Sequence, residues 1–297
     1  MKVRYRGVRG SIPVPGPSTS RYGGNSSCIE IRAEGAPPLV LDAGTGIRGL
    51  GRDLCLGGPR SVYMLFTHFH MDHLFGFPFF GPLYAPGFHV EVGMQAYSAT
   101  DASNKLAQYL SGVYHPVRLA DLSDNVSFRS VRPGRIFEMG PYRIDPVALN
   151  HPGGATGYRV EADGCSVVYL TDTAPLAKPG EGLVDGMRPS RPERRVLDVL
   201  READLVIMDT MFTFEEYLAH MTWGHAYPEY AAALADAAGA RRLALFHHAP
   251  DQTDADLDAL AEQWAKHEGC ASVSVAMEGV EVDLGIGRAL GDGPMSK

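Results

Sequence analysis

Apolar residues recur at every second position, or in short unbroken runs, through the first third of the chain. Glycine and proline interrupt these runs every few residues, as they do at turns between strands. The pattern predicts four β-strands, within KVRYRGV (2–8), SSCIEIRAE (26–34), PPLVLDAG (37–44) and SVYMLFTH (61–68).

A second series of β-type runs follows and then gives way to units in which a helix precedes a strand. Strands are expected within NVSFRSV (125–131), RIFEMGPYRIDPVALN (135–150), ATGYRVEADG (155–164) and CSVVYLTDT (165–173). The later units are ERRVLDVLREA with DLVIMDT, and PEYAAALADAAGA with RRLALFHH. In the last pair Pro228 marks a helix start and Gly239 a helix end. A final helix over about 253–267 and two short strands complete the pattern, which predicts an α/β layered domain.

Two stretches depart from this pattern. The segment 77–116 is rich in aromatic residues, glycine and proline, and is expected to be an insertion near the functional site, with one helix over about 99–113. Three roles are open for its aromatic residues: the wall of a substrate pocket, a homodimer contact, or local core packing. These residues are Phe77, Phe79, Phe80 and Tyr84. The Gly/Pro-rich segment 177–192 is better explained as a surface loop than as a domain boundary, so residues 1–297 are expected to form a single domain.

Composition excludes several classes of protein. The chain carries 35 acidic and 27 basic side chains, a net charge of −8, which disfavours nucleic-acid binding through a broad cationic surface. Its four cysteines form no C-x-x-C pair, which predicts reduced thiols rather than a disulfide framework. The N-terminus lacks the apolar run of a signal peptide, and no run reaches membrane-spanning length. A cytoplasmic protein without membrane association is therefore expected.

The densest group of candidate metal ligands is the segment THFHMDH (67–73), directly after a predicted strand. Its four candidates are His68, His70, Asp72 and His73. Because alternate residues of an extended segment share a face, the first three are expected to point one way and the fourth to leave from the next turn. The intervening Phe69 and Met71 are expected to face the interior and to fix the ligands' directions. Zinc sites usually take four imidazole or carboxylate ligands, so the segment nearly fills one site or half-fills two.

Further candidates stand at the ends of later β-type runs, where α/β proteins place ligand-binding residues. They are His151 in VALNHPGG, Asp172 in VVYLTDT, and either His247 or His248 in LALFHHAPD. Each alone is more often a cap or a loop residue, but together with THFHMDH they predict a metal site. A period of two places His247 and His248 on opposite faces of a regular strand, so only one of them can point into the site.

THFHMDH followed by His151, Asp172 and His247 resembles the metallo-β-lactamase superfamily, and LVLDAGTG resembles the strand and glycine turn that precede its metal motif. The resemblance implies a four-layer αβ/βα sandwich that holds two divalent metal ions. It also implies the ligands of each ion. The first ion is held by His68, His70 and His151, the second by Asp72, His73 and His247, and both by Asp172.

The resemblance also bears on the metal and on the last ligand. His70 stands where diiron electron-transfer members of the superfamily carry glutamate, which favours zinc, with manganese as the alternative. His247 is favoured over His248 because it directly follows the apolar strand, as in the family.

The segments DLVIMDTMF and TWGHAYPEY resemble the phosphodiesterase branch of the superfamily, which includes ribonuclease Z. The resemblance implies that Asp209 orients His225 and that His225 faces the leaving group; their alternatives are a turn cap and a solvated loop residue. Enzymes of this branch that mature transfer RNA carry a protruding arm, in bacterial members between the third-motif histidine and the bridging aspartate. Here 172 − 151 leaves a separation of only 21 residues. A small or cyclic phosphodiester is therefore expected as substrate rather than a large structured RNA.

The implied reaction is attack on the phosphodiester by a hydroxide that bridges the two ions, with His225 as general acid. Two ions about 3.5–4 Å apart lower the pKa of a bound water towards about 7 and neutralise charge on the phosphoryl oxygens. Asp72, Asp209 and His225 are the residues expected to carry catalysis. Two other functions remain open: hydrolysis of a thioester, lactone or β-lactam on the same metal site, and metal binding without catalysis.

Overall fold

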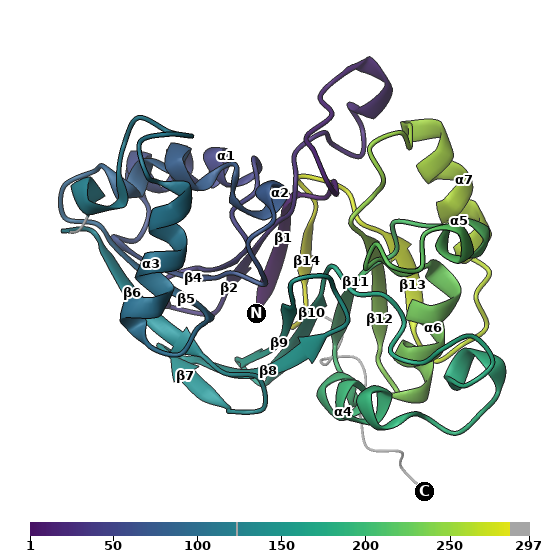
Figure 1. Cartoon of the computed structure of the whole chain (residues 1–297). Coiled ribbons are helices and arrows are strands. Elements are labelled where there is room, and N and C mark those ends of the chain that lie inside the picture. The colour runs from purple at the N-terminus through teal and green to yellow at the C-terminus, as the bar shows by residue number, and fades with distance from the viewer. Residues whose placement is uncertain (123, 286–297) are drawn as a thin grey trace, which may run out of the picture.

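Two seven-stranded sheets lie face to face at the centre of the molecule, and helices cover the outer face of each (Figure 1). The computed structural model describes residues 1–122 and 124–285. The layers form the four-layer αβ/βα sandwich that the sequence predicts. Within the described residues, no helix has both the length and the apolar character needed to cross a bilayer.

The first sheet has the strand order β14-β1-β2-β3-β4-β5-β6. Its strands are β14 (Glu281–Asp283), β1 (Lys2–Gly7), β2 (Cys28–Arg32), β3 (Leu39–Leu41), β4 (Ser61–Leu65), β5 (His89–Gln95) and β6 (Val126–Val131). Pairing is antiparallel from β14 to β3 and parallel from β3 to β6.

The second sheet has the order β13-β12-β11-β10-β9-β8-β7 and repeats this division. Its strands are β13 (Ser272–Val275), β12 (Arg242–Phe246), β11 (Leu205–Asp209), β10 (Cys165–Leu170), β9 (Ala155–Ala162), β8 (Tyr142–Leu149) and β7 (Phe137–Met139). Pairing is parallel from β13 to β10 and antiparallel from β10 to β7. The parallel strands β10 and β11 are buried along their whole length, which explains why they are continuous apolar runs in the sequence.

Three hydrophobic cores hold the layers together: one between the sheets, and one between each sheet and its helices. The first sheet is covered by α1 (Ile47–Gly57) and α3 (Ala99–Tyr109), and the second by α4 (Arg191–Leu200), α6 (Pro228–Ala237) and α7 (Asp254–Trp264). The helices α2 (Met71–Leu74) and α5 (Phe214–Ala219) are short. Short 3-10 turns occupy Pro17–Thr19, Phe77–Phe79, Gly81–Leu83, Leu119–Leu122 and Leu183–Asp185.

The segment 77–116 contains a strand that the sequence interpretation missed. β5 pairs with β4 on one side and β6 on the other, so this segment is built into the first sheet rather than added to it. The strand shows the usual alternation, with Val90, Val92 and Met94 buried. The aromatic residues around it masked this signal. The expected helix is present as α3.

The aromatic residues before β5 divide into two kinds. Phe77 and Phe80 are buried in the outer core of the first sheet, as local packing requires, whereas Phe79 and Tyr84 are exposed. The segment 177–192 contains one 3-10 turn and leads into α4.

Candidate metal centre

Side chains from both sheets converge beyond the carboxyl ends of four strands, β4, β8, β10 and β12. They form two overlapping groups, and within each group the candidate ligand atoms all lie within 4.8 Å of one another. The first group is His68, His70, His151 and Asp172, and the second is Asp72, His73, Asp172 and His247. These are the residues, in the same two groups, that the sequence interpretation named as ligands.

Asp172 belongs to both groups and turns one carboxylate oxygen towards each. Its Oδ2 lies 3.4 Å from His68 Nε2 and 3.6 Å from His151 Nε2. Its Oδ1 lies 3.1 Å from His73 Nε2 and 3.0 Å from His247 Nε2. A carboxylate that bridges two ions must present its two oxygens in this way.

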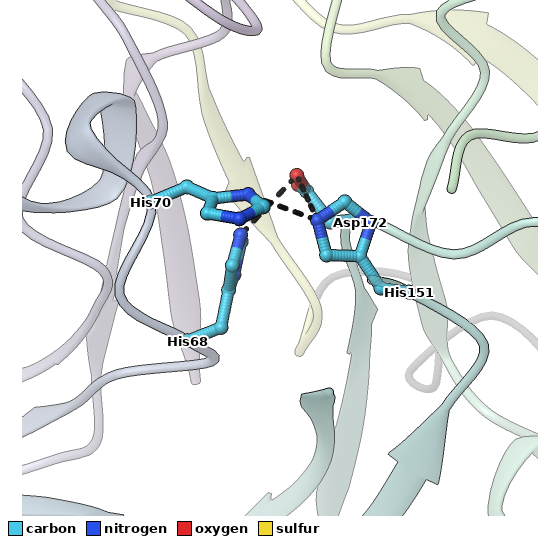
Figure 2. Close-up of side chains that lie close together, drawn as sticks. All are labelled: His68, His70, His151 and Asp172. Atoms are coloured by element: carbon cyan, nitrogen blue, oxygen red, sulfur yellow. Dashed lines mark hydrogen bonds and ion pairs between the residues drawn. The ribbon is translucent and has the colours of Figure 1, made fainter. Parts of the chain in front are cut away.

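The first group is shown in Figure 2. His68 and His70 come from the segment between β4 and α2, whereas His151 and Asp172 approach from the loops after β8 and β10 on the opposite side. His70 Nδ1 lies 3.0 Å from His151 Nε2, and the three imidazole centroids are 4.5–4.8 Å apart. The nitrogen atoms therefore surround a small volume next to the Asp172 carboxylate.

The hydrogen bonds of His68 and His73 show that both ligand groups suit a cation. His73 Nδ1 lies 2.8 Å from Asp42 Oδ2, and a carboxylate can only accept, so Nδ1 carries the proton. The Thr67 hydroxyl donates to Asp42 and therefore accepts from His68 Nδ1. When these rings are neutral, as imidazole ligands of a metal ion are, Nε2 carries a lone pair, and both Nε2 atoms are buried without a hydrogen-bond partner. Divalent metal ions bind such nitrogens and the facing carboxylate oxygens together.

The pKa shifts in the cluster also indicate that it suits a cation. Burial alone lowers the pKa of His73, but the surrounding carboxylates, chiefly Asp72, outweigh it and raise this pKa well above its ordinary value. Burial alone raises the pKa of Asp172, but the facing imidazoles, chiefly His247, lower it well below its ordinary value. The carboxylates thus favour positive charge beside them, which bound divalent ions supply.

Asp42 is a residue of this site that the sequence interpretation missed. It directly follows β3, is fully buried, and accepts from His73 Nδ1, from the Tyr169 hydroxyl at 3.1 Å and from the Thr67 backbone N–H at 2.8 Å. A carboxylate in this position fixes the orientation and the tautomer of a ligand histidine. The only signal in the sequence is the aspartate that ends the apolar run of LVLDAGTG.

Replacement of Asp42 by asparagine should weaken metal binding by about 10- to 100-fold, because His73 loses the acceptor that orients it. Competition with a chelator measures this affinity. The matched control is Asp254→Asn, since Asp254 is a buried carboxylate that accepts the backbone N–H groups of Arg21 and Tyr22 instead. Equal metal affinity in both variants would contradict the assigned role of Asp42.

Four residues in or beside the cluster have left-handed backbone conformations. They are Ser11, Asp42, Asp172 and His247, with φ between 56° and 63°. Such conformations are uncommon outside glycine and concentrate at functional sites. Asp42, Asp172 and His247 follow the ends of β3, β10 and β12, where this conformation turns the chain so that their side chains face the cluster or its ligands. Ser11 also donates its backbone N–H to Asp72 Oδ2 at 2.9 Å, a contact that the sequence does not indicate.

The structure separates the two adjacent histidines after β12. His247 Nε2 lies 3.2 Å from Asp72 Oδ2, inside the second group. His248 Nε2 lies 2.8 Å from the backbone oxygen of Ala276, to which it donates. Burial lowers the pKa of His248 to about 3 despite this bond, so the ring is neutral. His247 is therefore the one placed to bind metal.

Alanine at these two positions should have opposite effects. His247→Ala should reduce metal content, because the second group loses a nitrogen. His248→Ala should retain metal but lower the free energy of unfolding by about 1–3 kcal/mol, because the Ala276 oxygen loses its buried partner. Metal analysis and urea unfolding of both variants measure these effects. Loss of metal from His248→Ala alone would reverse the assignment.

The backbone of residues 67–73 differs from the expected extended segment. β4 ends at Leu65, and α2 begins at Met71 with His70 as its N-cap. Asp72 and His73 therefore leave from a helical turn, where an alternation of period two no longer applies. The expectation that Met71 is buried is wrong, since its side chain is 42% exposed. Phe69 is half-buried and packs against the outer core of the first sheet.

Asp209 and His225 form a hydrogen-bonded pair beside the metal groups. Asp209 ends β11, His225 precedes α6, and their Oδ2 and Nδ1 atoms are 2.8 Å apart. Both residues have ligand atoms within 4.8 Å of those of Asp172 and His247. Burial alone lowers the pKa of His225, but the Asp209 carboxylate opposes it and raises this pKa to about 9. The ring is therefore protonated at neutral pH, and Nε2 is the nitrogen left to donate to a substrate.

Comparison with known proteins places the chain in a family. Residues 39–248 match the model of the beta-lactamase superfamily domain. The chain belongs to this superfamily. Together with the fold and the His/Asp cluster, this membership indicates a metal-dependent hydrolase that binds divalent ions.

Similar proteins span nearly the whole chain. The uncharacterized protein Rv1339 of Mycobacterium tuberculosis is 26% identical over 286 residues, which cover 95% of this chain and 92% of that protein. Ribonuclease Z of Methanosarcina acetivorans is 28% identical over 293 residues, covering 86% and 89%. The metallo-beta-lactamase fold protein YhfI of Bacillus subtilis superposes with a TM-score of 0.68 at 18% identity, covering 95% and 98%. The last likeness shows that the two proteins share a fold.

Proposed function

We propose that this superfamily member hydrolyses a small or cyclic phosphodiester, with two divalent ions held by the two groups that share Asp172. The observation that carries the proposal is the Asp209–His225 pair, which puts a protonated imidazole next to the bridging carboxylate. The similarity to ribonuclease Z, an enzyme named for RNA cleavage, supports a phosphodiester as the bond that is broken. Imidazole and carboxylate ligands favour zinc, with manganese as the alternative.

Four residues of the chain have distinct roles in the proposed reaction. Bound ions at this site would polarise the phosphoryl group and activate the attacking water. Asp172 holds the two ligand groups together, and Ser11 steadies Asp72 through its backbone N–H. As the bond from phosphorus to the leaving oxygen breaks, that oxygen takes the proton from His225. Asp209 keeps the ring oriented and stabilises its charged form, and a general acid of this kind typically contributes about 10²–10⁴-fold.

A compact segment between the two ligand loops supports a small substrate. His151 and Asp172 are separated by β9 and β10, which form a hairpin closed at Asp163 and Gly164. This segment is described throughout and contains no projecting arm. The net charge of −8 also disfavours a long polyanion.

A substrate panel tests the proposal directly. Protein loaded with zinc or with manganese is assayed on 2′,3′-cyclic, 3′,5′-cyclic and linear phosphodiesters, and on a thioester, a lactone and a β-lactam. We expect the highest kcat/KM on a small or cyclic phosphodiester. Preference for one of the other three classes, or inactivity of the metal-loaded protein on all phosphodiesters, would refute the proposal.

A further inference from the structure

We propose that Trp223 is a stacking platform for the base of a nucleoside phosphodiester and thereby determines how tightly such a substrate binds. The inference rests on the proposed function and deepens it by naming a residue that determines which substrates bind well. It starts from an exposed aromatic side chain at the rim of the metal centre.

Trp223 is followed in the chain by two residues that belong to the metal centre, Gly224 and His225. Gly224 offers its carbonyl oxygen to His151 Nδ1 at 2.9 Å, and His225 is the proposed proton donor. Gly224 has a φ of +90°, and a Cβ atom there would lie 2.2 Å from His151 Nδ1. The chain is therefore pressed against a ligand of the first group at this point. This close approach sets the position of Trp223 relative to the reacting atoms.

A series of aromatic rings leads from the proton donor to Trp223. The ring centroids of His225 and Phe212 are 5.6 Å apart, those of Phe212 and His220 are 5.5 Å apart, and those of His220 and Trp223 are 4.4 Å apart. The Trp223 backbone N–H also donates to the His220 oxygen at 2.9 Å. The indole thus packs against His220 on one side, yet 60% of the residue is exposed. An exposed indole that packs against other rings beside a polar site is suited to stack on a flat aromatic ligand.

A nucleobase fits this position for geometric and electrostatic reasons. In a nucleoside phosphodiester, the leaving oxygen belongs to the sugar that carries the base. When that oxygen lies at His225, the proposal places the base towards Trp223, which the series of rings joins to His225. A protein of net charge −8 cannot depend on broad phosphate attraction. Stacking supplies affinity without charge and accepts any base.

A second copy of the chain is the other candidate occupant of this region, because α5 exposes Phe214 and Leu218 nearby in the sequence. Phe214, however, belongs to a different group of rings and packs on Tyr227, with centroids 5.1 Å apart. The ring series of Trp223 instead ends at His225, inside the metal centre. This connection favours a substrate over a partner subunit.

Binding can be measured without turnover. The chain has two tryptophans, and Trp264 is nearly buried, so Trp264→Phe leaves Trp223 as the only indole reporter. Adenosine 5′-monophosphate should quench this fluorescence, whereas ribose 5-phosphate should not. By calorimetry, Trp223→Ala should weaken binding of adenosine 5′-monophosphate by about 5- to 150-fold, the range for loss of one stacked base.

The matched control is Phe79→Ala. Phe79 is also 60% exposed, and it lines a separate apolar recess of about 230 Å³ with Pro13 and Phe75. This variant should bind adenosine 5′-monophosphate like the wild type. If Phe79→Ala weakens binding and Trp223→Ala does not, the base lies in that recess and the proposal is overturned.

Kinetics separate this inference from the function on which it rests. Trp223→Ala should raise KM for a nucleoside 2′,3′-cyclic phosphate, with little change in kcat, and should leave the base-free sugar cyclic phosphate unaffected. An equal effect on both substrates, or a smaller oligomer of Trp223→Ala in sedimentation, would assign Trp223 to structure or to a subunit contact. If the wild type hydrolyses no phosphodiester while nucleotide binding still depends on Trp223, the proposed reaction fails and the platform stands.

Discussion

Replacement of Asp172 by alanine should leave the folded protein with about one divalent ion or fewer per chain and without measurable hydrolysis. The carboxylate is buried and faces both ligand groups, so its removal takes an anionic ligand from both groups at once. Metal analysis after exhaustive dialysis, together with the phosphodiester assay, measures both effects. Circular dichroism verifies that the variant is folded.

A second aspartate provides the control for backbone effects. Asp163 has a φ of 52°, close to the 56° of Asp172, but lies in the turn between β9 and β10. Asp163→Ala should therefore disturb the same backbone conformation and keep its full metal content and activity. An Asp172→Ala protein that still held two ions tightly would remove Asp172 from the bridging position.

Replacement of His225 by alanine should lower kcat by about 10²–10⁴-fold while metal content stays unchanged, because the variant loses a proton donor and not a ligand. The loss should depend on the leaving group. A substrate that expels p-nitrophenolate needs little protonation and should lose much less activity than one that expels an alkoxide. An equal loss on both substrates, or a loss of metal, would contradict the role of general acid.

The pH dependence of kcat tests the partner of His225. Asp209 raises the pKa of His225 to about 9 against the lowering effect of burial. A general acid must be protonated, so activity should be present below this pKa and fall as the pH rises through it. Asp209→Asn removes the carboxylate, lowers the pKa of His225, and should move the fall in kcat to lower pH. An unchanged profile would show that another group limits the reaction at high pH.

Strand ends made much of this site predictable from the sequence. His151, Asp172 and His247 each follow an apolar run, and strands that run in the same direction deliver such residues to one edge of a sheet. Their convergence with THFHMDH is therefore predictable from the sequence. The layered arrangement followed from the same strand and helix patterns together with the family resemblance.

Contacts between distant segments account for what the sequence did not reveal. Asp42 acts through His73 and Tyr169, which are 31 and 127 residues further along the chain, and no local pattern encodes such contacts. Met71 was misplaced because a helix begins at that residue, where strand alternation no longer applies. β5 was missed because its alternation lies within a segment whose composition resembles an insertion.

The origin of the ligands along the chain has a consequence for the maturation of the protein. The first group needs His151 in addition to the 67–73 segment, and the second needs His247. Neither sheet alone contains a complete set, so an ion held by either group would join the two sheets across their interface. A chain emerging from the ribosome has no complete second site until residue 247 has been made and both sheets have closed. The second ligand group can therefore be completed only late in synthesis, after the first, whereas the hydrophobic core between the sheets joins them without any ion.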